Sequence, residues 1–444
     1  MLKQMDSSAA ALLIISALTC AAMICAIIIK PKVRFGRVTL NTYWMVTIAG
    51  AAVILFSGLI NPASLIEGLT ADSAINPIKI LVLFFAMSFL SLFLDEISFF
   101  RYLAQMTVKF AGASQIKLFL ALYAVISILT VFTSNDVIIL TFTPFICYFA
   151  KYAGINPIPY VLAEFAAANT WSMALVIGNP TNIYLASMYS VGFAEYASVM
   201  ILPALVSAAA AFLILFLIFR KTLSAPLKPL DEKETAVLLS DKPALIIGLI
   251  HLLGCTILLA VSSFIGLDMW LISLAAAISL AVFIFILSLV RRKRPHELAS
   301  AAKRVPWQFV PFVISMFTIV LALSESGITE SLAELLSAGD AVFTYGAASF
   351  ISANLINNIP MSVLFAFVIQ SAPAASLMPS LYASVAGSNL CAILTPLGAL
   401  AGIMWMGILR DTGVKFSYLS FVKYGILIAV PALLAALCII RLMV

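Results

Sequence analysis

The sequence predicts an all-α polytopic membrane protein made of two inverted-topology repeats, each with five crossings and one re-entrant helical hairpin. Three observations support this prediction. Hydrophobic residues make up 64% of the 444 residues and charged residues only 10%, a composition typical of helical membrane proteins. Polar residues interrupt two long apolar runs near their centres. The order of apolar segments in the first half of the chain is repeated in the second half.

The two interrupted runs are the predicted hairpins. The first extends over about residues 116–150 and contains Thr133-Ser134-Asn135-Asp136, and the second extends over about 342–369 and contains Ile356-Asn357-Asn358. A membrane-spanning helix needs about 20 residues at a rise of 1.5 Å per residue, whereas the stretch 119–132 has only fourteen residues. Each run is therefore expected to form two half-spans that meet at a polar tip inside the protein, where non-helical backbone is tolerated at membrane depth.

The other apolar segments form a matching series in each half. In the first half they lie near residues 8–29, 40–60, 78–100, 158–189 and 197–219, and in the second near 243–264, 269–290, 307–324, 379–409 and 424–441. Because five is an odd number, the second half enters the membrane from the opposite side, as in inverted-repeat transporters. We predict a first repeat at 1–219, a cytoplasmic linker at 220–242 with the charge run Asp231–Glu234, and a second repeat at 243–444.

The distribution of positive charge predicts the orientation. Every Lys and Arg except Lys3, Lys79 and Arg441 falls in loops expected on one side of the membrane. By the positive-inside rule these loops are cytoplasmic, and both termini lie outside. The net charge of +6 therefore indicates membrane orientation, with the lipid bilayer as a partner, and does not indicate nucleic-acid binding.

No pattern in the sequence indicates an enzyme. The chain has two histidines and six scattered cysteines, without the spacing of a metal or redox site and without a catalytic set of residues. It also lacks the glycine-rich phosphate-binding loop of ATPases. We expect no cofactor and no metal site, and transport driven by an ion gradient or by a separate soluble ATPase.

The predicted substrate site lies at the two hairpin tips and at two breaks in the long segments, Gly178-Asn179-Pro180 and Leu394-Thr395-Pro396-Leu397-Gly398. Tips and breaks expose backbone groups and half-helix ends that attract ions and polar solutes. The predicted substrate-binding residues are Ser134, Asn135, Asn169, Thr170, Gly178, Asn179, Thr181, Asn182, Asn357, Asn358, Ser388, Asn389, Thr395 and Gly398. Their donors and acceptors suit a small hydroxylated or oxyanionic solute. Since no Lys or Arg lies in these stretches, a multiply charged anion would depend on helix dipoles and a co-bound cation.

Acidic residues in apolar surroundings are the candidates for coupling to a proton or to sodium. Asp136 is the main one, because an unpaired carboxylate in the membrane is costly unless it binds a proton, an ion or a partner. Its alternative role, compatible with the first, is to cap the second arm of the hairpin. Asp95 and Glu96, near the end of the third span, are further ion-coupling candidates. Glu164 and Glu325 could also take part in gating or coupling.

A set of motifs spread over nearly the whole chain carries a family resemblance. The motifs are Leu94-Asp95-Glu96-Ile97-Ser98-Phe99-Phe100, Ser134-Asn135-Asp136, Ala167-Ala168-Asn169-Thr170, Ile356-Asn357-Asn358-Ile359-Pro360, and Gly387-Ser388-Asn389-Leu390 leading to the second break. In order and spacing they resemble the arsenite permease (arsenical pump membrane protein) family of the ion transporter superfamily, related to divalent anion/sodium symporters. The resemblance implies a homodimer in the cell inner membrane, with a scaffold domain and a mobile transport domain that moves like an elevator. It also implies efflux of largely neutral arsenous acid, coupled to protons or aided by a soluble ATPase.

Two departures from the family pattern leave the substrate open. The chain has Asn389 where the family tends to have an acidic residue, and its first break is as similar to carboxylate and anion permeases as to arsenite pumps. The leading hypothesis is an ion-coupled arsenite or antimonite exporter. The second is a sodium- or proton-coupled importer of a carboxylate or inorganic anion. The third is a non-transporting membrane component of a larger assembly.

Overall fold

The computed structural model describes residues 7–30, 32–35, 38–70, 76–227 and 241–444. These residues are mainly helical, and the predicted linker charge run, Asp231–Glu234, lies outside them. Within the described ranges, ten helices are long and apolar enough to cross a membrane. The prediction of an all-α polytopic membrane protein is confirmed. The inverted relation of the two halves, their boundaries and the linker stay predictions.

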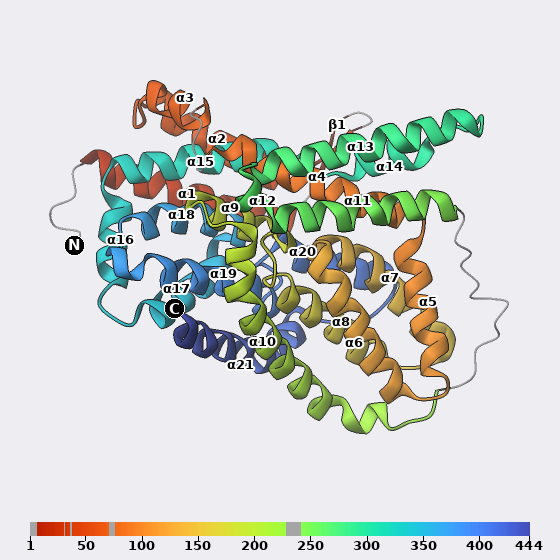
Figure 1. Cartoon of the computed structure of the whole chain (residues 1–444). Helices are drawn as coiled ribbons and strands as arrows, with labels where there is room; N and C mark the ends of the chain where they lie inside the picture. The colour runs from red at the N-terminus through yellow and green to blue at the C-terminus, as the bar shows by residue number, and fades with distance from the viewer. Residues whose placement is uncertain (1–6, 31, 36–37, 71–75, 228–240) are drawn as a thin grey trace.

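One group of helices, here called the first helix group, forms the upper layer in Figure 1. Its long members are α1 (Ser7–Ile29), α2 (Tyr43–Phe56), α4 (Pro77–Glu96), α11 (Lys242–Ala260), α13 (Met269–Val290) and α15 (Phe309–Glu325). Shorter elements join them: β1 (Lys32–Phe35), β2 (Val38–Asn41), α3 (Pro62–Thr70), α12 (Ser262–Ile265) and α14 (His296–Arg304). Helix α4 contacts α11, α13 and α15, so this group combines segments from both halves of the chain.

The remaining long helices form the second helix group. They are α6 (Gln115–Phe132), α7 (Asn135–Ala153), α8 (Ile158–Trp171), α9 (Pro180–Met188), α10 (Phe193–Leu223), α17 (Ala341–Ile356), α18 (Asn358–Gln370), α19 (Leu377–Leu394), α20 (Leu400–Asp411) and α21 (Tyr418–Met443). The 3-10 turns η2 (Val176–Gly178) and η3 (Ala374–Ser376) lie between them. Helix α10 packs along α21, and α7 packs against α20, so this group also joins both halves. Both predicted hairpins and both predicted breaks belong to it.

Two short amphipathic helices connect the groups. Helix α5 (Phe99–Ala111) follows α4 and leads to α6, and α16 (Ile328–Leu336) follows α15 and leads to α17. In Figure 1 they lie at opposite ends of the molecule. Each therefore precedes a predicted hairpin, one at each end of the helix bundle.

Local sequence signals mark many helix starts. Asn76 precedes Pro77, and its side chain accepts a hydrogen bond from the backbone N–H of Ile78 at 2.9 Å. Asp241 caps α11 and Asp340 caps α17 in the same way. Such side-chain caps satisfy backbone donors that have no partner inside the helix, and Pro is well suited to the first helical position.

The helix lengths differ from the predictions at several points. The first hairpin has arms of 18 and 19 residues in α6 and α7, because the first arm begins at Gln115, capped by Ser114, and not near residue 119. Helix α2 has only 14 residues, because residues 38–41 pair in a β-hairpin. The third span ends at Glu96, since Ser98 has a positive φ of 65° that breaks the helix before α5.

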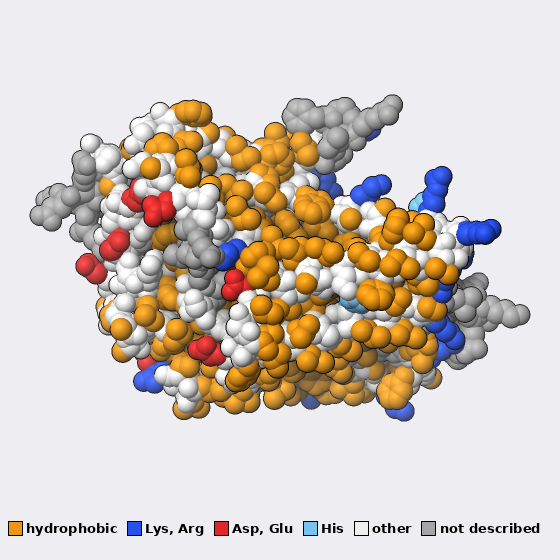
Figure 2. Space-filling view, turned by 45° about the horizontal axis from the view of Figure 1, so that its top comes forward, with side chains coloured by type: hydrophobic (Ala, Val, Ile, Leu, Met, Phe, Trp, Pro, Cys, Tyr) orange, Lys and Arg blue, Asp and Glu red, His pale blue; other side chains and the backbone are white. Residues whose placement is uncertain are grey.

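Surface charge agrees with the predicted orientation. Figure 2 shows Lys and Arg side chains gathered at one end of the molecule, beyond the ends of α13 and α14, and most of the visible Asp and Glu at the other. Between these ends lies a broad band of exposed hydrophobic side chains. A hydrophobic band bounded by polar ends is what a membrane-embedded helical bundle presents to lipid.

Candidate functional site

The two predicted breaks are present in the structure, and each has a glycine pressed against backbone. Helix α8 ends at Trp171 and α9 begins at Pro180, with η2 between them, and α19 ends at Leu394 before α20 begins at Leu400. A Cβ atom on Gly178 would lie 2.2 Å from the carbonyl oxygen of Ser172, and one on Gly398 would lie 2.5 Å from that of Cys391. Both breaks fold back on the preceding helix at a distance that only glycine allows.

The two breaks meet through the side-chain amide of Asn389. Its Nδ2 donates to Asn182 Oδ1 at 2.7 Å and to the Val385 carbonyl at 2.8 Å. Its Oδ1 accepts from Ser172 Oγ at 2.8 Å and from Asn179 Nδ2 at 3.0 Å. All four hydrogen-bonding positions of this fully buried amide are therefore used. This amide joins α19 of the second half to the break between α8 and α9 of the first.

A second pair of side chains also connects the two broken segments. The hydroxyl groups of Thr181 and Ser388 lie 3.0 Å apart, and Thr181 Oγ1 also donates to Asn179 Oδ1 at 3.1 Å. Asn179 itself caps α9, since its Oδ1 accepts from the Thr181 backbone N–H at 3.2 Å. The structure thus brings together five predicted substrate-binding residues. We call these five the Asn389 cluster: Asn179, Thr181, Asn182, Ser388 and Asn389.

The tip of the second hairpin folds onto the second break. The backbone N–H of Asn358 donates to the Gly398 carbonyl at 2.9 Å, and Asn358 Nδ2 donates to the Ser388 carbonyl at 3.3 Å. Asn357 Nδ2 donates to the Leu397 carbonyl at 3.2 Å, and Asn357 has a positive φ of 74° that turns the chain between α17 and α18. The predicted association of this tip with this break is therefore present, and it adjoins the Asn389 cluster through Ser388.

The first hairpin tip makes a separate contact. Asn135 Nδ2 donates to Asn169 Oδ1 at 3.2 Å, which links the tip to the end of α8. Thr170 Oγ1 instead donates to the Ala166 carbonyl of its own helix at 2.8 Å. Ser134 is the N-cap residue of α7. Among the described residues, no hydrogen bond joins Asn135 or Asn169 directly to the Asn389 cluster, so the predicted set divides into two parts.

Two polar residues of the site were not in the predicted set. Ser172 Oγ donates to Asn389, and the Ser172 carbonyl accepts from Asn182 Nδ2 at 2.7 Å. Asn354 Oδ1 accepts from Thr395 Oγ1 at 2.7 Å. Both lie within four residues of a residue or motif that the sequence analysis selected. A search for every polar residue within one helical turn of a tip or break would have found them.

Asp136 lies in the first turn of α7, just beyond the tip. Ser134, not Asp136, caps this helix, so the alternative capping role predicted for Asp136 is wrong. Among the described residues the Asp136 carboxyl group makes no hydrogen bond or ion pair within 4 Å, and Tyr43 of α2 is near enough to interact with it electrostatically. A carboxyl group in this position is available to a proton or a cation.

Asp95 and Glu96 share one arginine. Arg304 of α14 lies 2.7 Å from Asp95 Oδ2 through Nη2 and 2.7 Å from Glu96 Oε1 through Nη1. Thr141 Oγ1 of α7 donates to Asp95 Oδ1 at 2.8 Å. The Asp95 carboxylate therefore connects α4 and α14 of the first helix group with a hairpin arm of the second. This pairing favours a structural contact between the groups over ion binding, because the Arg304 guanidinium already occupies both carboxyl groups.

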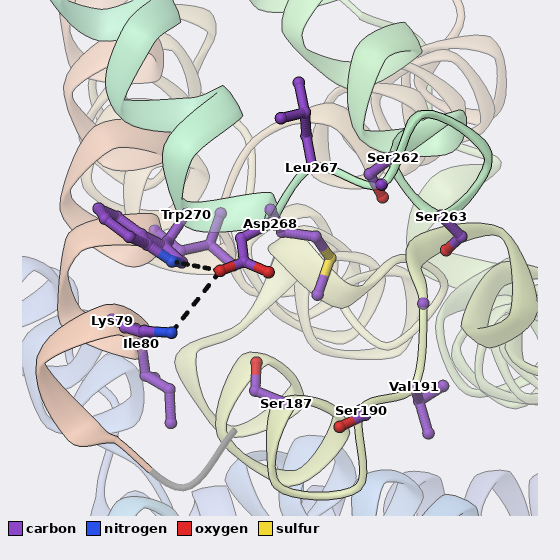
Figure 3. Close-up of a pocket in the computed structure, with 14 residues that line it drawn as sticks. Lys79, Ile80, Ser187, Ser190, Val191, Ser262, Ser263, Leu267, Asp268 and Trp270 are labelled. Carbon is purple, nitrogen blue, oxygen red and sulfur yellow. Dashed lines mark hydrogen bonds and ion pairs between the residues drawn. The ribbon is translucent and has the colours of Figure 1, made fainter. Parts of the chain in front are cut away.

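A cavity of ≈ 500 Å³ separates the two helix groups at the end where α4, α10 and α13 begin. Figure 3 shows Lys79, Asp268 and Trp270 on one side of it and, on the other, Ser187 of α9 with Ser190 and Val191 of the turn between α9 and α10. Asp268 Oδ2 accepts from Trp270 Nε1 at 3.0 Å and lies 3.6 Å from Lys79 Nζ. None of the predicted substrate-binding residues lines this cavity.

The Asn389 cluster and the two tips are built from amides, hydroxyls and backbone groups. All of the predicted substrate-binding residues except Thr395 are buried. No group of three His, Cys, Asp or Glu side chains that could hold a metal ion occurs in the described part of the chain. These described groups are neutral hydrogen-bond donors and acceptors that bond mainly to one another, and they offer no fixed positive charge to an anion.

Several known proteins are similar to this chain. The arsenical pump membrane protein of Escherichia coli is 25% identical over 408 residues, covering 89% of this chain and 92% of that protein. The arsenical pump membrane protein of Yersinia enterocolitica is 28% identical over 368 residues, covering 80% of this chain and 84% of that protein. These matches confirm the predicted resemblance to arsenical pump membrane proteins.

Two solved transporter structures share the fold. The YdaH transporter of Alcanivorax borkumensis has a TM-score of 0.54 at 15% identity, covering 98% of both chains. The MtrF protein of Neisseria gonorrhoeae, described as an antimetabolite efflux pump, has a TM-score of 0.55 at 13% identity, covering 100% of this chain and 96% of that one. At these identities the likeness concerns the fold alone.

The similar proteins are transporters, which agrees with the prediction that the chain is not an enzyme. The family model described as citrate transporter matches residues 4–387, which is most of the chain. Together with the ten apolar helices, this match identifies a multi-pass inner-membrane transporter that belongs to the citrate transporter (CitMHS) family.

Proposed function

We propose that this protein is an ion-coupled secondary transporter that exports arsenite or antimonite. The single observation that carries the proposal is the Asn389 cluster, a buried set of amide and hydroxyl groups at the junction of the two breaks. Arsenous acid is a small, hydroxylated and mostly uncharged solute at neutral pH. Its hydroxyl groups both donate and accept hydrogen bonds, so they match amides and hydroxyls without needing a fixed cation.

The names of the similar proteins support the same substrate. Curated relatives at 25% and 28% identity over most of their length are described as arsenical pump membrane proteins. The chain has no phosphate-binding loop of its own, so an ion gradient is the proposed source of energy, with Asp136 as the first candidate for the coupling site. A separate soluble ATPase is the alternative source.

A second candidate function is import of a carboxylate or an inorganic anion with sodium or protons. The description of the matching family model as citrate transporter favours it. A multiply charged carboxylate would need compensation, because the described residues of the Asn389 cluster carry no positive side chain. Helix ends at the breaks and a co-bound cation would have to supply that compensation.

The proposed movement follows from the two helix groups. All predicted tips and breaks belong to the second helix group, and α5 and α16 connect it to the first helix group at opposite ends. We propose that the second helix group carries the solute past the first in an elevator-like movement, with the two hairpins re-entrant and the two halves related as inverted repeats. A homodimer is the proposed assembly.

Growth of cells in arsenite tests the substrate. Deletion of the gene should make cells more sensitive to arsenite, and expression of the wild-type chain should restore resistance, whereas the Asp136→Asn variant should not. Unchanged sensitivity after deletion, together with lost growth on a carboxylate as carbon source, would favour the importer.

A further inference from the structure

Glu164 is a second acidic residue deep in the second helix group, and its surroundings are unusual for a carboxyl group. It lies in the middle of α8 and is fully buried. Thr143 Oγ1 of α7 donates to Glu164 Oε1 at 3.1 Å, and Trp405 Nε1 of α20 donates to Oε2 at 3.2 Å. Three helices, two from the first half and one from the second, therefore meet at this carboxyl group.

No positive charge in the described part of the chain balances Glu164. Among the described residues, no Lys, Arg or His side chain lies within 4 Å of it. Aromatic rings pack against Trp405: the ring centroids of Phe165 and Phe421 lie 5.1 and 5.5 Å from that of Trp405. In such a dry site an ionised carboxylate with two neutral donors is costly, and binding a proton removes the cost.

The two partners suit a proton better than a metal cation. A hydroxyl group can donate to a carboxylate and can also accept from a protonated carboxyl group, so Thr143 satisfies Glu164 in both states. The indole N–H of Trp405 only donates and occupies Oε2. A hard cation needs a shell of several oxygen ligands, whereas the hydrogen-bond partners of this carboxyl group among the described residues are one hydroxyl oxygen and one N–H.

Glu164 is placed where its charge state would affect both halves of the site. Along α8 it precedes Asn169 by five residues, about 7.5 Å at 1.5 Å per residue. Its partner Thr143 belongs to the helix that begins at the first hairpin tip, and Trp405 belongs to the helix that follows the second break. A proton bound at Glu164 is therefore linked to three segments that each start or end at a tip or break: its own helix α8, and α7 and α20 through one direct hydrogen bond each.

We propose that Glu164 is the residue that binds and releases the coupling proton during transport. This inference rests on the proposed ion-coupled transport and deepens it, since it selects the proton as the coupling ion. Asp95 and Glu96 are less suited to this task because Arg304 pairs with both. Glu164 then takes the place of Asp136 as the proton carrier, on the side of α8 facing α7 and α20, and Asp136 is required at the tip for the solute step.

Other titratable groups near Glu164 are few and neutral. Cys147 on α7 is near enough to Glu164 for the two side chains to interact electrostatically. Tyr123 on α6, Tyr160 on α8 and Tyr196 on α10 are buried, and each donates a hydrogen bond elsewhere. On these elements and on α20 and α21, the following charged residues are exposed near helix ends: Lys117, Lys151, Glu195, Arg220, Lys221, Arg410, Asp411 and Lys423. None of these groups competes with Glu164 as a buried proton carrier.

Proteoliposomes holding the full chain separate proton coupling from solute binding. Arsenite is present on both sides for an exchange assay, and a pH gradient is imposed for an accumulation assay. We expect Glu164→Gln to retain exchange and to lose all accumulation driven by the gradient. Thr143→Val and Trp405→Phe should retain accumulation but shift the pH at which the rate is half-maximal. Accumulation by Glu164→Gln at the wild-type level would overturn the inference.

An infrared titration of the purified protein tests Glu164 without any transport. A carboxyl band that appears and disappears with pH, and that is absent from Glu164→Gln, is the expected result. A Glu164 band that stays protonated across the whole pH range of the folded protein would show a structural role and overturn the inference. If the wild type accumulates no arsenite but this band titrates, the proposed substrate fails while the proton site stands.

Discussion

The side chains of Asn182 and Asn389 share a 2.7 Å hydrogen bond although 207 positions separate them in the sequence. Asn182 lies just after the first break and Asn389 just before the second. Because both amides are fully buried, this contact joins the two broken segments in the interior of the second helix group.

Asn389→Asp should weaken the junction. An ionised carboxylate cannot donate to Asn182 Oδ1, so this buried acceptor loses its donor, whereas the Val385 carbonyl still accepts from Ser388 Oγ at 2.9 Å. We expect the free energy of unfolding to fall by about 1–3 kcal/mol, measured by thermal unfolding in detergent. Ser384→Ala on the same helix is the matched control, because the Ser384 hydroxyl is buried without a hydrogen-bond partner. An equal fall in the free energy of unfolding in Asn389→Asp and Ser384→Ala would contradict a stabilising role for the Asn389 hydrogen bonds.

The two break glycines should not tolerate a side chain. Alanine at Gly178 or Gly398 would place Cβ within 2.5 Å of a backbone carbonyl oxygen, so the break must shift. Overpacking of this kind costs about 1–3 kcal/mol of stability. Gly407→Ala in α20 meets open space and should leave stability unchanged or raise it by about 0.5–1 kcal/mol. A similar melting temperature for all three variants would mean that the breaks are not close-packed.

Asn357 allows the backbone and the amide to be tested separately. Its positive φ of 74° favours glycine, so Asn357→Ala should cost about 1–3 kcal/mol of stability that Asn357→Gly does not. If the amide contributes to solute binding, both variants, and Asn179→Ala, should weaken apparent affinity by about 1–3 kcal/mol. Transport measured over a range of solute concentrations gives that affinity. Wild-type affinity in all three variants would show that neither Asn357 at the second tip nor Asn179 at the first break binds the solute.

Arg304→Gln should destabilise the contact between the helix groups. The side chain of Asp95 is only 3% exposed, and removal of its partner leaves a buried charge at a cost of about 3 kcal/mol. Adding Asp95→Asn to Arg304→Gln should restore most of the loss. Glu96→Gln alone should cost less, because the side chain of Glu96 is 21% exposed. If the stability losses of Arg304→Gln and Asp95→Asn simply add in the double variant, the two side chains do not stabilise each other.

Much of the fold was predictable because apolar segments, and the polar residues that interrupt them, can be recognised directly in the sequence. The long helices, the two breaks and the two polar tips lie where residues such as Asn179, Asn358 and Gly398 predicted them. The fourteen-residue first arm was wrong because residues 115–118 also join the helix, which begins at Gln115. The short helix α2 was missed because Lys32–Phe35 pairs with Val38–Asn41, and strand pairing next to a span leaves no hydropathy signal.

The contacts of the site were less predictable than its members. Spacing alone could not show that Asn389 bonds to Ser172, or that Asn135 pairs with Asn169 and not with the Asn389 cluster, because these contacts depend on how helices from both halves pack. The partner of Asp95 could not be predicted either, since Arg304 is 209 positions away in the sequence. Glu164 was a minor candidate until the structure showed its burial and its two neutral donors.

Transport in everted membrane vesicles tests the central claim most directly. Vesicles that contain the wild-type chain should accumulate trivalent arsenite when a proton gradient is imposed, and vesicles with Asp136→Asn should not, although the variant is inserted and folded. A panel of carboxylates, each tested with a proton or a sodium gradient, is the control for substrate. Absence of arsenite movement, together with gradient-dependent flux of a carboxylate, would contradict the exporter and identify an anion importer.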